Sequence, residues 1–152
     1  MTSLRLLAPV AAAAVALFVA GCGGSGGVSK NDYVKSLNEA VSSLQKSTAS
    51  LGPAATTGGA AEQRLEDGAK AMDAAAENFN EIAPPDDAKH AHGQIVDGLH
   101  KFADTFRDAA EAARAKDSSK LLKVISDIDS SPGAKELQAA TEELAAKGYN
   151  VK

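Results

Sequence analysis

Apolar residues recur every three or four positions through most of this chain, which is the spacing that places them on one face of an α-helix. The first stripe predicts a helix over about 30–51, with Ser29 as its N-cap. The second runs over 61–82 and ends at Pro84-Pro85, where two backbone donors are missing. The third and longest stripe begins at this diproline, so three helices are expected over about 30–113.

Two shorter stripes follow. Asp117 or Ser118 is expected to cap a fourth helix, while Ser131 and Pro132 open a fifth as its N-cap and first helical residue. Gly148 suits the left-handed position that closes a helix in a Schellman motif. The fourth helix is expected to carry a compact apolar face made of Leu121, Leu122, Val124, Ile125 and Ile128.

The remaining signals decide the fold class. No segment after the first 21 residues alternates β-branched or aromatic residues with polar ones, so no strand is expected. Short loops between the later helices favour antiparallel neighbours. The sequence therefore predicts an all-α, up-down antiparallel helical bundle of four main elements, with the last one broken into two helices.

The N-terminal segment has a different pattern. Arg5 precedes fifteen mostly apolar residues, 6–20, which would rise only about 22 Å as a helix, less than a membrane span requires. A cleaved export signal is therefore favoured over a transmembrane helix. Residues 23–27, Gly-Gly-Ser-Gly-Gly, have the composition of a flexible tether that reaches about 18 Å at most.

The end of this segment, Val19-Ala20-Gly21-Cys22, resembles the lipobox of bacterial lipoproteins. The resemblance implies that Cys22 receives diacylglycerol, carries fatty-acyl chains such as palmitate and becomes the mature N-terminus. Residues 1–21 are then a cleaved signal peptide, 22–28 the lipidated cysteine and its tether, and 29–152 the helical domain. The alternative for Cys22 is an unmodified thiol, and as the one cysteine of the chain it cannot form an internal disulfide.

The net charge of the chain indicates which classes of partner it could bind. Cleavage leaves 152 − 21 = 131 residues, and losing Arg5 changes the formal net charge from −4 to −5, because residues 1–21 contain no Asp or Glu. An acidic domain has no electrostatic reason to bind nucleic acid or anionic lipid. Membrane attachment is therefore expected through the lipid anchor at Cys22, because two or more acyl chains hold a protein stably.

Three short motifs resemble small actinobacterial lipoproteins of uncharacterised function: Asp32-Tyr33-Val34, Ala83-Pro84-Pro85 followed by His90 and His92, and Gly148-Tyr149. This resemblance implies a location on the outer face of the cytoplasmic membrane. It supplies no activity and no catalytic residue.

The third helix carries the residues that invite a chemical interpretation. Asp86 with His90 and His100 with Asp104 have the i,i+4 spacing at which imidazole and carboxylate reach one divalent metal ion. A solvated helix face is the favoured interpretation, because no compact ligand motif is present. His92 lies inside the apolar stripe and is expected to be a buried structural histidine.

The expected function follows from the anchor and the fold. No nucleophile motif or phosphate-binding loop is present, so neither enzyme activity nor a cofactor is expected. We expect a membrane-anchored extracytoplasmic lipoprotein whose bundle is an interaction or structural module with an envelope protein as partner. The alternative is a module that binds a small ligand in an alanine-lined interior or a metal through His90, His92 or His100.

Overall fold

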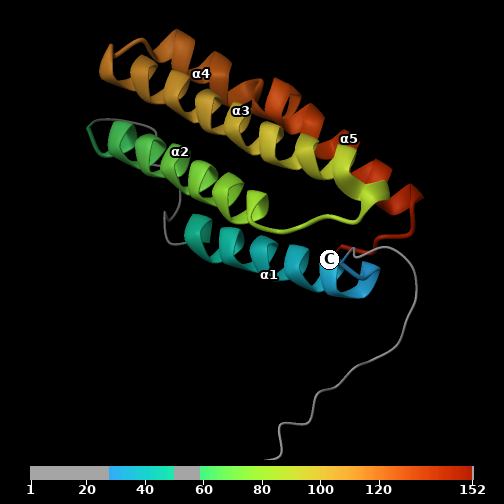
Figure 1. Cartoon of the computed structure of the whole chain (residues 1–152). Helices are drawn as coiled ribbons and strands as arrows, with labels where there is room; N and C mark the ends of the chain where they lie inside the picture. The colour runs from blue at the N-terminus through green and yellow to red at the C-terminus, as the bar shows by residue number, and fades with distance from the viewer. Residues whose placement is uncertain (1–27, 50–58, 152) are drawn as a thin grey trace, which may run out of the picture.

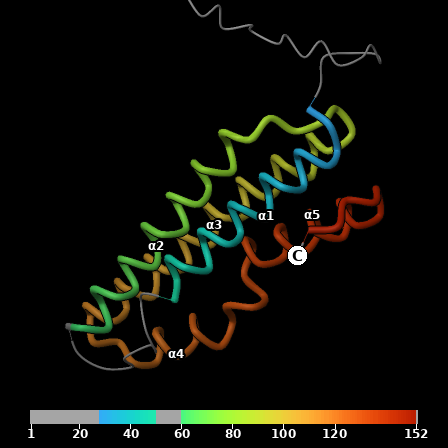
Figure 2. Tube along the Cα trace, turned by 90° about the horizontal axis from the view of Figure 1, so that it is seen from below, coloured from blue at the N-terminus to red at the C-terminus, as the bar shows by residue number. Residues whose placement is uncertain are grey.

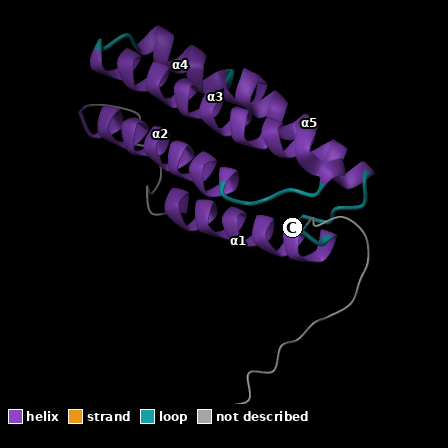
Figure 3. Ribbon diagram, in the orientation of Figure 1, coloured by secondary structure: helices purple, strands orange, loops and turns teal. Residues whose placement is uncertain are grey.

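The computed structural model describes residues 28–49 and 59–151, and all regular secondary structure within these ranges is helical (Figure 3). This confirms the all-α prediction. Cys22 and the segment before it lie outside the described residues. The elements are α1 (Lys30–Ala49), α2 (Gly59–Asn80), η1 (Asp86–Ala88), α3 (Lys89–Arg114), α4 (Ser118–Ser126), η2 (Ile128–Ser130) and α5 (Pro132–Ala146).

The helices run up and down side by side (Figures 1 and 2). The most extensive contact is between α2 and α3, and α5 packs on another part of α3. The short helix α4 also contacts α3, so α4 and α5 together form one broken column along it. α1 packs mainly on α2, and it runs antiparallel to α5.

Side chains fix the starts of three helices as the sequence predicted. The Asp32 amide donates to Ser29 Oγ over 3.2 Å, and the Ala134 amide donates to Ser131 Oγ over 3.2 Å. Asp117, rather than Ser118, caps α4, because its carboxylate accepts a hydrogen bond of 2.9 Å from the Lys120 amide. Each cap satisfies an amide that has no partner within its own helix.

The end of α5 has the predicted Schellman geometry. Gly148 has a φ of 78°, which favours glycine, and its amide donates to the Ala145 carbonyl over 2.9 Å. The Tyr149 amide donates to the Leu144 carbonyl over 2.9 Å. This turn brings Tyr149 back onto the bundle, where its side chain is buried.

Two local predictions were wrong. α2 ends at Asn80, before Ile82, and the chain after the diproline first forms the 3₁₀ turn η1 before α3 begins. The apolar face of α4 is not compact, because Leu121 is buried whereas Leu122 is 67% exposed and Ile125 is 41% exposed. A nine-residue helix that packs chiefly on one neighbour buries only one narrow stripe, and these apolar residues span a wider arc.

Small residues bring α3 and α5 very close together. A Cβ atom added at Gly133 would lie 2.6 Å from the Gly98 carbonyl oxygen and 2.6 Å from the Phe102 amide nitrogen. The two backbones are therefore in direct contact at this crossing. Alanines line much of the remaining core between α2 and α3, where they permit a similarly close approach.

Candidate functional site

The seam between α1 and α5 contains an apolar cavity of about 290 Å³. Leu37, Val41 and Leu44 form one wall, and α5 supplies the opposite wall. Ile95 and Leu99 of α3 complete the lining from inside the bundle. The full lining is Leu37, Val41, Leu44, Phe79, Ile95, Leu99, Leu137, Thr141, Leu144 and Val151.

This cavity differs from the alanine-lined interior that the sequence suggested. Its lining is leucine, isoleucine and valine with Phe79 and Thr141, and none of its described lining residues is alanine. The alanines instead lie where helices approach closely, so that they leave little space between them. The cavity exists because α1 and α5 are not among the extensively packed helix pairs.

A layer of buried rings lies beside the cavity. Tyr33, one helical turn before Leu37, meets Tyr149 edge to face with the ring centroids 5.5 Å apart and an interplanar angle of 88°. The His92 ring centroid lies 5.7 Å from that of Tyr33. All three side chains are buried in the core.

His92 is held in the neutral form. Its Nδ1 atom lies 2.9 Å from the Tyr33 hydroxyl, and the ring also hydrogen-bonds to the Phe79 backbone. A neutral imidazole has one donor and one acceptor, which assigns the Tyr33 hydroxyl as donor to Nδ1 and the other ring nitrogen as donor to the Phe79 carbonyl. Burial lowers the pKa of His92, and the Phe79 contact opposes this shift only in part.

The two tyrosines also remain protonated. Burial, followed by the nearby Tyr149, raises the pKa of Tyr33 to about 12. Burial and the Asp87 carboxylate raise the pKa of Tyr149 to about 12, and the Tyr149 hydroxyl donates to Asp87 Oδ1 over 2.7 Å. The three rings are therefore uncharged and hydrogen-bonded at neutral pH.

The other two histidines have partners on neighbouring helices. His90 Nδ1 lies 2.7 Å from Glu143 of α5, and His100 Nδ1 lies 3.2 Å from Asp73 of α2. The carboxylates at i,i+4 spacing from these histidines pair elsewhere. Asp86 contacts Lys89 at 2.6 Å and Asp104 contacts Arg107 at 2.6 Å.

The structure does not bring His90, His92 and His100 together. Each has a different partner, and His92 alone is buried. Over residues 28–49 and 59–151, no three His, Cys, Asp or Glu side chains lie in an arrangement that would hold a metal ion. This geometry favours the predicted solvated face over a metal site on the third helix.

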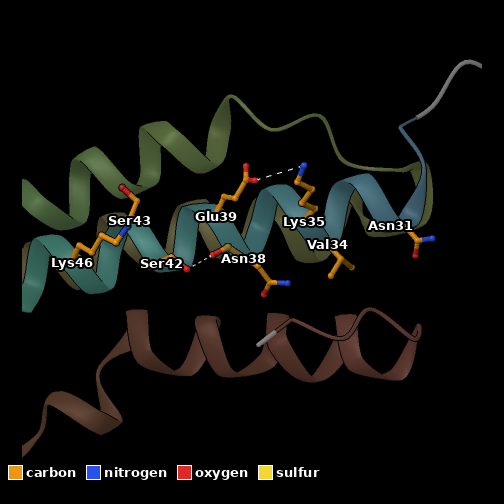
Figure 4. A pocket seen from close by; sticks show the side chains of 8 residues that line it. All are labelled: Asn31, Val34, Lys35, Asn38, Glu39, Ser42, Ser43 and Lys46. Atoms are coloured by element: carbon orange, nitrogen blue, oxygen red, sulfur yellow. Dashed lines mark hydrogen bonds and ion pairs between the residues drawn. The ribbon is translucent and has the colours of Figure 1, made fainter. Parts of the chain in front are cut away.

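The outer face of α1 carries a second, shallow hollow (Figure 4). Its volume of about 610 Å³ is larger, but all of its lining residues belong to α1 and none is buried. Lys35 and Glu39 form an ion pair of 4.0 Å there, and Ser42 donates to the Asn38 carbonyl over 2.8 Å. A mixed polar face along one helix is ordinary hydrated surface, so we place the candidate site in the α1–α5 cavity.

The anchor residue Cys22 lies outside the described residues, so its geometry adds nothing to the sequence interpretation. No helix within the described ranges has the length and apolar character to cross a bilayer. The feature of the candidate site that the sequence analysis missed is the position of the cavity. In the sequence, its lining residues on α1 and α5 form two helical stripes, 37, 41, 44 and 137, 141, 144. Such stripes have the same spacing as those of any packed core.

Comparison with known families, characterised proteins and solved structures found no significant match to this chain. Its function must therefore be inferred from the anchor motif and from the geometry of the bundle.

Proposed function

We propose that this chain is a membrane-anchored extracytoplasmic lipoprotein whose helical bundle binds a small apolar ligand in the α1–α5 cavity. The anchor part rests on the lipobox-like sequence ending at Cys22. The ligand part rests on one observation, the concave apolar cavity of about 290 Å³. Ligand sites are concave, mostly apolar and begin at about this size.

The binding chemistry is hydrophobic. An apolar cavity of about 150 Å³ is already able to hold benzene, so this cavity has room for a larger hydrocarbon group. Each methylene transferred from water into such a site contributes about 0.8 kcal/mol. The site needs no metal or cofactor for this task.

The interaction module that the sequence favoured is the second candidate. Leu122 and Ile125 lie one turn apart on α4 and expose their side chains. They are two of the three large exposed apolar residues in the described ranges, so the patch is small for a protein interface. Reproducible crosslinking of one envelope protein to α4 in cells would raise this candidate above ligand binding.

Lipidation is tested by replacing Cys22 with Ser in the native host. We expect the wild-type chain to take up labelled acyl chains and to fractionate with membranes, and the C22S variant to take up no label. A wild-type chain that takes no label would contradict the anchor. Membrane fractionation of the variant alone is not sufficient, because the uncleaved signal also holds it there.

Ligand binding is tested on the full-length protein purified from its native envelope, by native mass spectrometry. We expect a mass beyond the acylated chain, which is lost in Val41→Phe, where the new ring fills the cavity. Ser43→Phe is the matched control, because Ser43 lies on the same turn of α1 and is exposed. Absence of extra mass from the wild type, or equal loss in both variants, would contradict the proposal.

A further inference from the structure

Helix α1 is attached to the bundle by few buried side chains. Only two of its twenty residues, Tyr33 and Leu37, are buried, and both lie in its first half. Its most extensive contact is with α2, and this contact is far smaller than the one between α2 and α3. A segment with few buried contacts can open locally while the rest of the domain stays folded. The first half of α1 is such a segment.

Tyr33 supplies a buried hydrogen bond between α1 and α3. Its hydroxyl lies 2.9 Å from Nδ1 of His92, and the two residues are 0% and 6% exposed. In the neutral ring Nδ1 is the acceptor, because the other ring nitrogen donates to the Phe79 carbonyl. A proton taken up from solvent therefore binds at Nδ1 and converts this acceptor into a donor. The hydroxyl hydrogen of Tyr33 then loses its acceptor inside the core.

We infer that protonation of His92 releases the first half of α1 from the bundle and thereby opens the α1–α5 cavity. Leu37 lies one helical turn after Tyr33 and lines this cavity, so this part of the lining moves together with the tyrosine. The inference adds a form of regulation to the proposed ligand site. It rests on the proposed function only for its use, because the release of α1 requires no ligand.

The groups around His92 supply no counter-charge for an imidazolium. The histidine ion pairs in the described ranges are those of His90 and His100, so His92 has none. The carboxylate of Asp87 is exposed and accepts a hydrogen bond from Tyr149 instead. A buried charge without a partner is unfavourable, whereas water solvates it once α1 has moved away.

Every element at this end of the bundle contributes titratable or polar groups, and the charged ones contact one another, backbone carbonyls, Tyr149 or solvent rather than the His92 ring. They are Lys30 and Tyr33 of α1, the Phe79 carbonyl and the exposed Glu77 and Glu81 of α2, Asp87 of η1, His90 of α3, Glu143 of α5, and Lys147 and Tyr149 after it.

The pH dependence of this opening has a definite sign and an upper limit. Burial, opposed in part by the Phe79 contact, lowers the pKa of His92 while α1 is docked. In the open form the ring is hydrated, and its pKa returns to the ordinary value of about 6.5. The open form therefore binds a proton more tightly, so a lower pH favours it. Between pH 7.5 and 5.5 the ratio of open to closed protein rises by at most about tenfold.

Amide hydrogen exchange measures this opening. The full-length protein, purified from its native envelope, is exchanged in deuterated buffer at pH 7.5 and at pH 5.5, with a chelator in both buffers. The rates are corrected for the intrinsic pH dependence of amide exchange. We expect the protection factors of residues 33–41 to fall by up to about tenfold at pH 5.5, and those of α3 to change less. No fall in α1, or an equal fall in both helices from global unfolding, would overturn the inference.

His92→Gln tests whether the pH dependence belongs to this residue. The glutamine amide does not titrate, so the protection of α1 in this variant should be the same at both pH values. His90→Gln and His100→Gln are matched controls, because both histidines lie on α3 with exposed side chains, and both variants should keep the wild-type fall. A wild-type fall in His92→Gln, or its loss in a control, would contradict the role of His92.

Tyr33→Phe gives a second test, which also serves if His92→Gln does not fold by circular dichroism. Without the hydroxyl, His92 has no partner at Nδ1 while α1 is docked, so α1 should be less protected already at pH 7.5. The expected fall is about fivefold or more, which corresponds to a buried hydrogen bond of at least about 1 kcal/mol. Unchanged protection of α1, or an equal fall in α3, would count against the release of α1.

A thiol probe reports whether the cavity itself opens. Leu37 is 0% exposed and lines the cavity, so the thiol of Leu37→Cys should react with a maleimide only when α1 moves away. Ser43→Cys is the control, because Ser43 is exposed on the same helix and corrects for the pH dependence of the thiolate. After subtraction of the wild-type labelling, the rate of Leu37→Cys relative to Ser43→Cys should rise at pH 5.5. A constant ratio would refute the opening of the cavity.

The inference and the proposed function fail separately, because neither hydrogen exchange nor thiol labelling uses a ligand. A native protein without bound extra mass would contradict the proposed function and leave the release of α1 standing. Unchanged exchange and labelling at pH 5.5 would remove the pH-dependent opening and leave ligand binding standing.

Discussion

Helix α5 makes two different contacts along its length, and their difference explains the architecture. Against α3, Gly133 meets Gly98 with the backbones in direct contact. Against α1, the branched side chains Leu137 and Leu144 border a cavity of about 290 Å³. One side of the same helix is therefore packed without space, while the other leaves room for a ligand.

The bundle has a closely packed part and a loosely packed part. We call α2, α3 and α5 the frame, because the α2–α3 and α3–α5 contacts are the most extensive. α1 is the wall, and buried hydrogen bonding holds it at one end through Tyr33 and His92. Close packing resists any change of volume, whereas a seam with space tolerates one.

The largest effect on stability is expected from Gly133→Ala, which places a side-chain atom in the contact between α3 and α5. The added Cβ would lie 2.6 Å from backbone atoms that cannot move aside as a flexible side chain does. We expect a loss of about 3 kcal/mol in the free energy of unfolding, measured by urea denaturation. Gly93→Ala is the control, because its Cβ meets nothing within 4 Å, and a gain of about 0.5–1 kcal/mol is expected from helix propensity. Equal stability of both variants would contradict the direct backbone contact between α3 and α5.

A smaller loss in the free energy of unfolding is expected from Tyr33→Phe, which removes a buried hydrogen bond between α1 and α3. Removing the hydroxyl leaves the buried Nδ1 of His92 without its partner, at a cost of about 1–3 kcal/mol. Tyr149→Phe is the matched comparison, since its partner Asp87 is exposed and water replaces the lost hydroxyl. Urea denaturation should rank Tyr33→Phe as the less stable variant. A lower stability of Tyr149→Phe would show that the hydrogen bond between Tyr33 and His92 is not the one that holds α1 on the bundle.

The smallest effect is expected from pH. Burial lowers the pKa of His92 in the folded state, so below about pH 6.5 the unfolded chain binds more protons at this residue than the folded chain does. Stability should therefore be complete above pH 6.5 and decrease as the pH falls toward the folded pKa. His92→Gln should flatten this decrease between pH 6.5 and 5. Parallel stability curves for wild type and variant would refute the role of His92.

Short-range signals in the sequence were sufficient for the helices and for the capped ends of α1, α4 and α5. Ser131-Pro132 and Gly148 act within a few residues, and the structure has the expected hydrogen bonds at both positions. The short helix α4 shows where such signals fail. Its apolar residues predicted one compact apolar face, but which of them are buried depends on how many neighbours surround the helix, and this property is not local.

The candidate site required tertiary information throughout. Tyr33 and His92 are 59 positions apart, and nothing in either segment indicates that they pair. The i,i+4 pairs of histidine and carboxylate that the spacing allows do not form. Glu143 and Asp73 on neighbouring helices contact the imidazoles, and the local carboxylates pair with Lys89 and Arg107. Exposed ion pairs each contribute a similar, small free energy, so the spacing along one helix does not determine which carboxylate pairs with which histidine.

The start of α1 and the end of α5 meet at one end of the bundle. The Lys30 ammonium donates to the Lys147 carbonyl over 2.6 Å and lies 4.4 Å from the centre of the Tyr149 ring. For protein engineering, this proximity makes the domain a candidate for circular permutation. A short linker would join the two ends, and new termini opened in the exposed turn between α4 and α5 would place a fused reporter on the frame, away from the α1 wall.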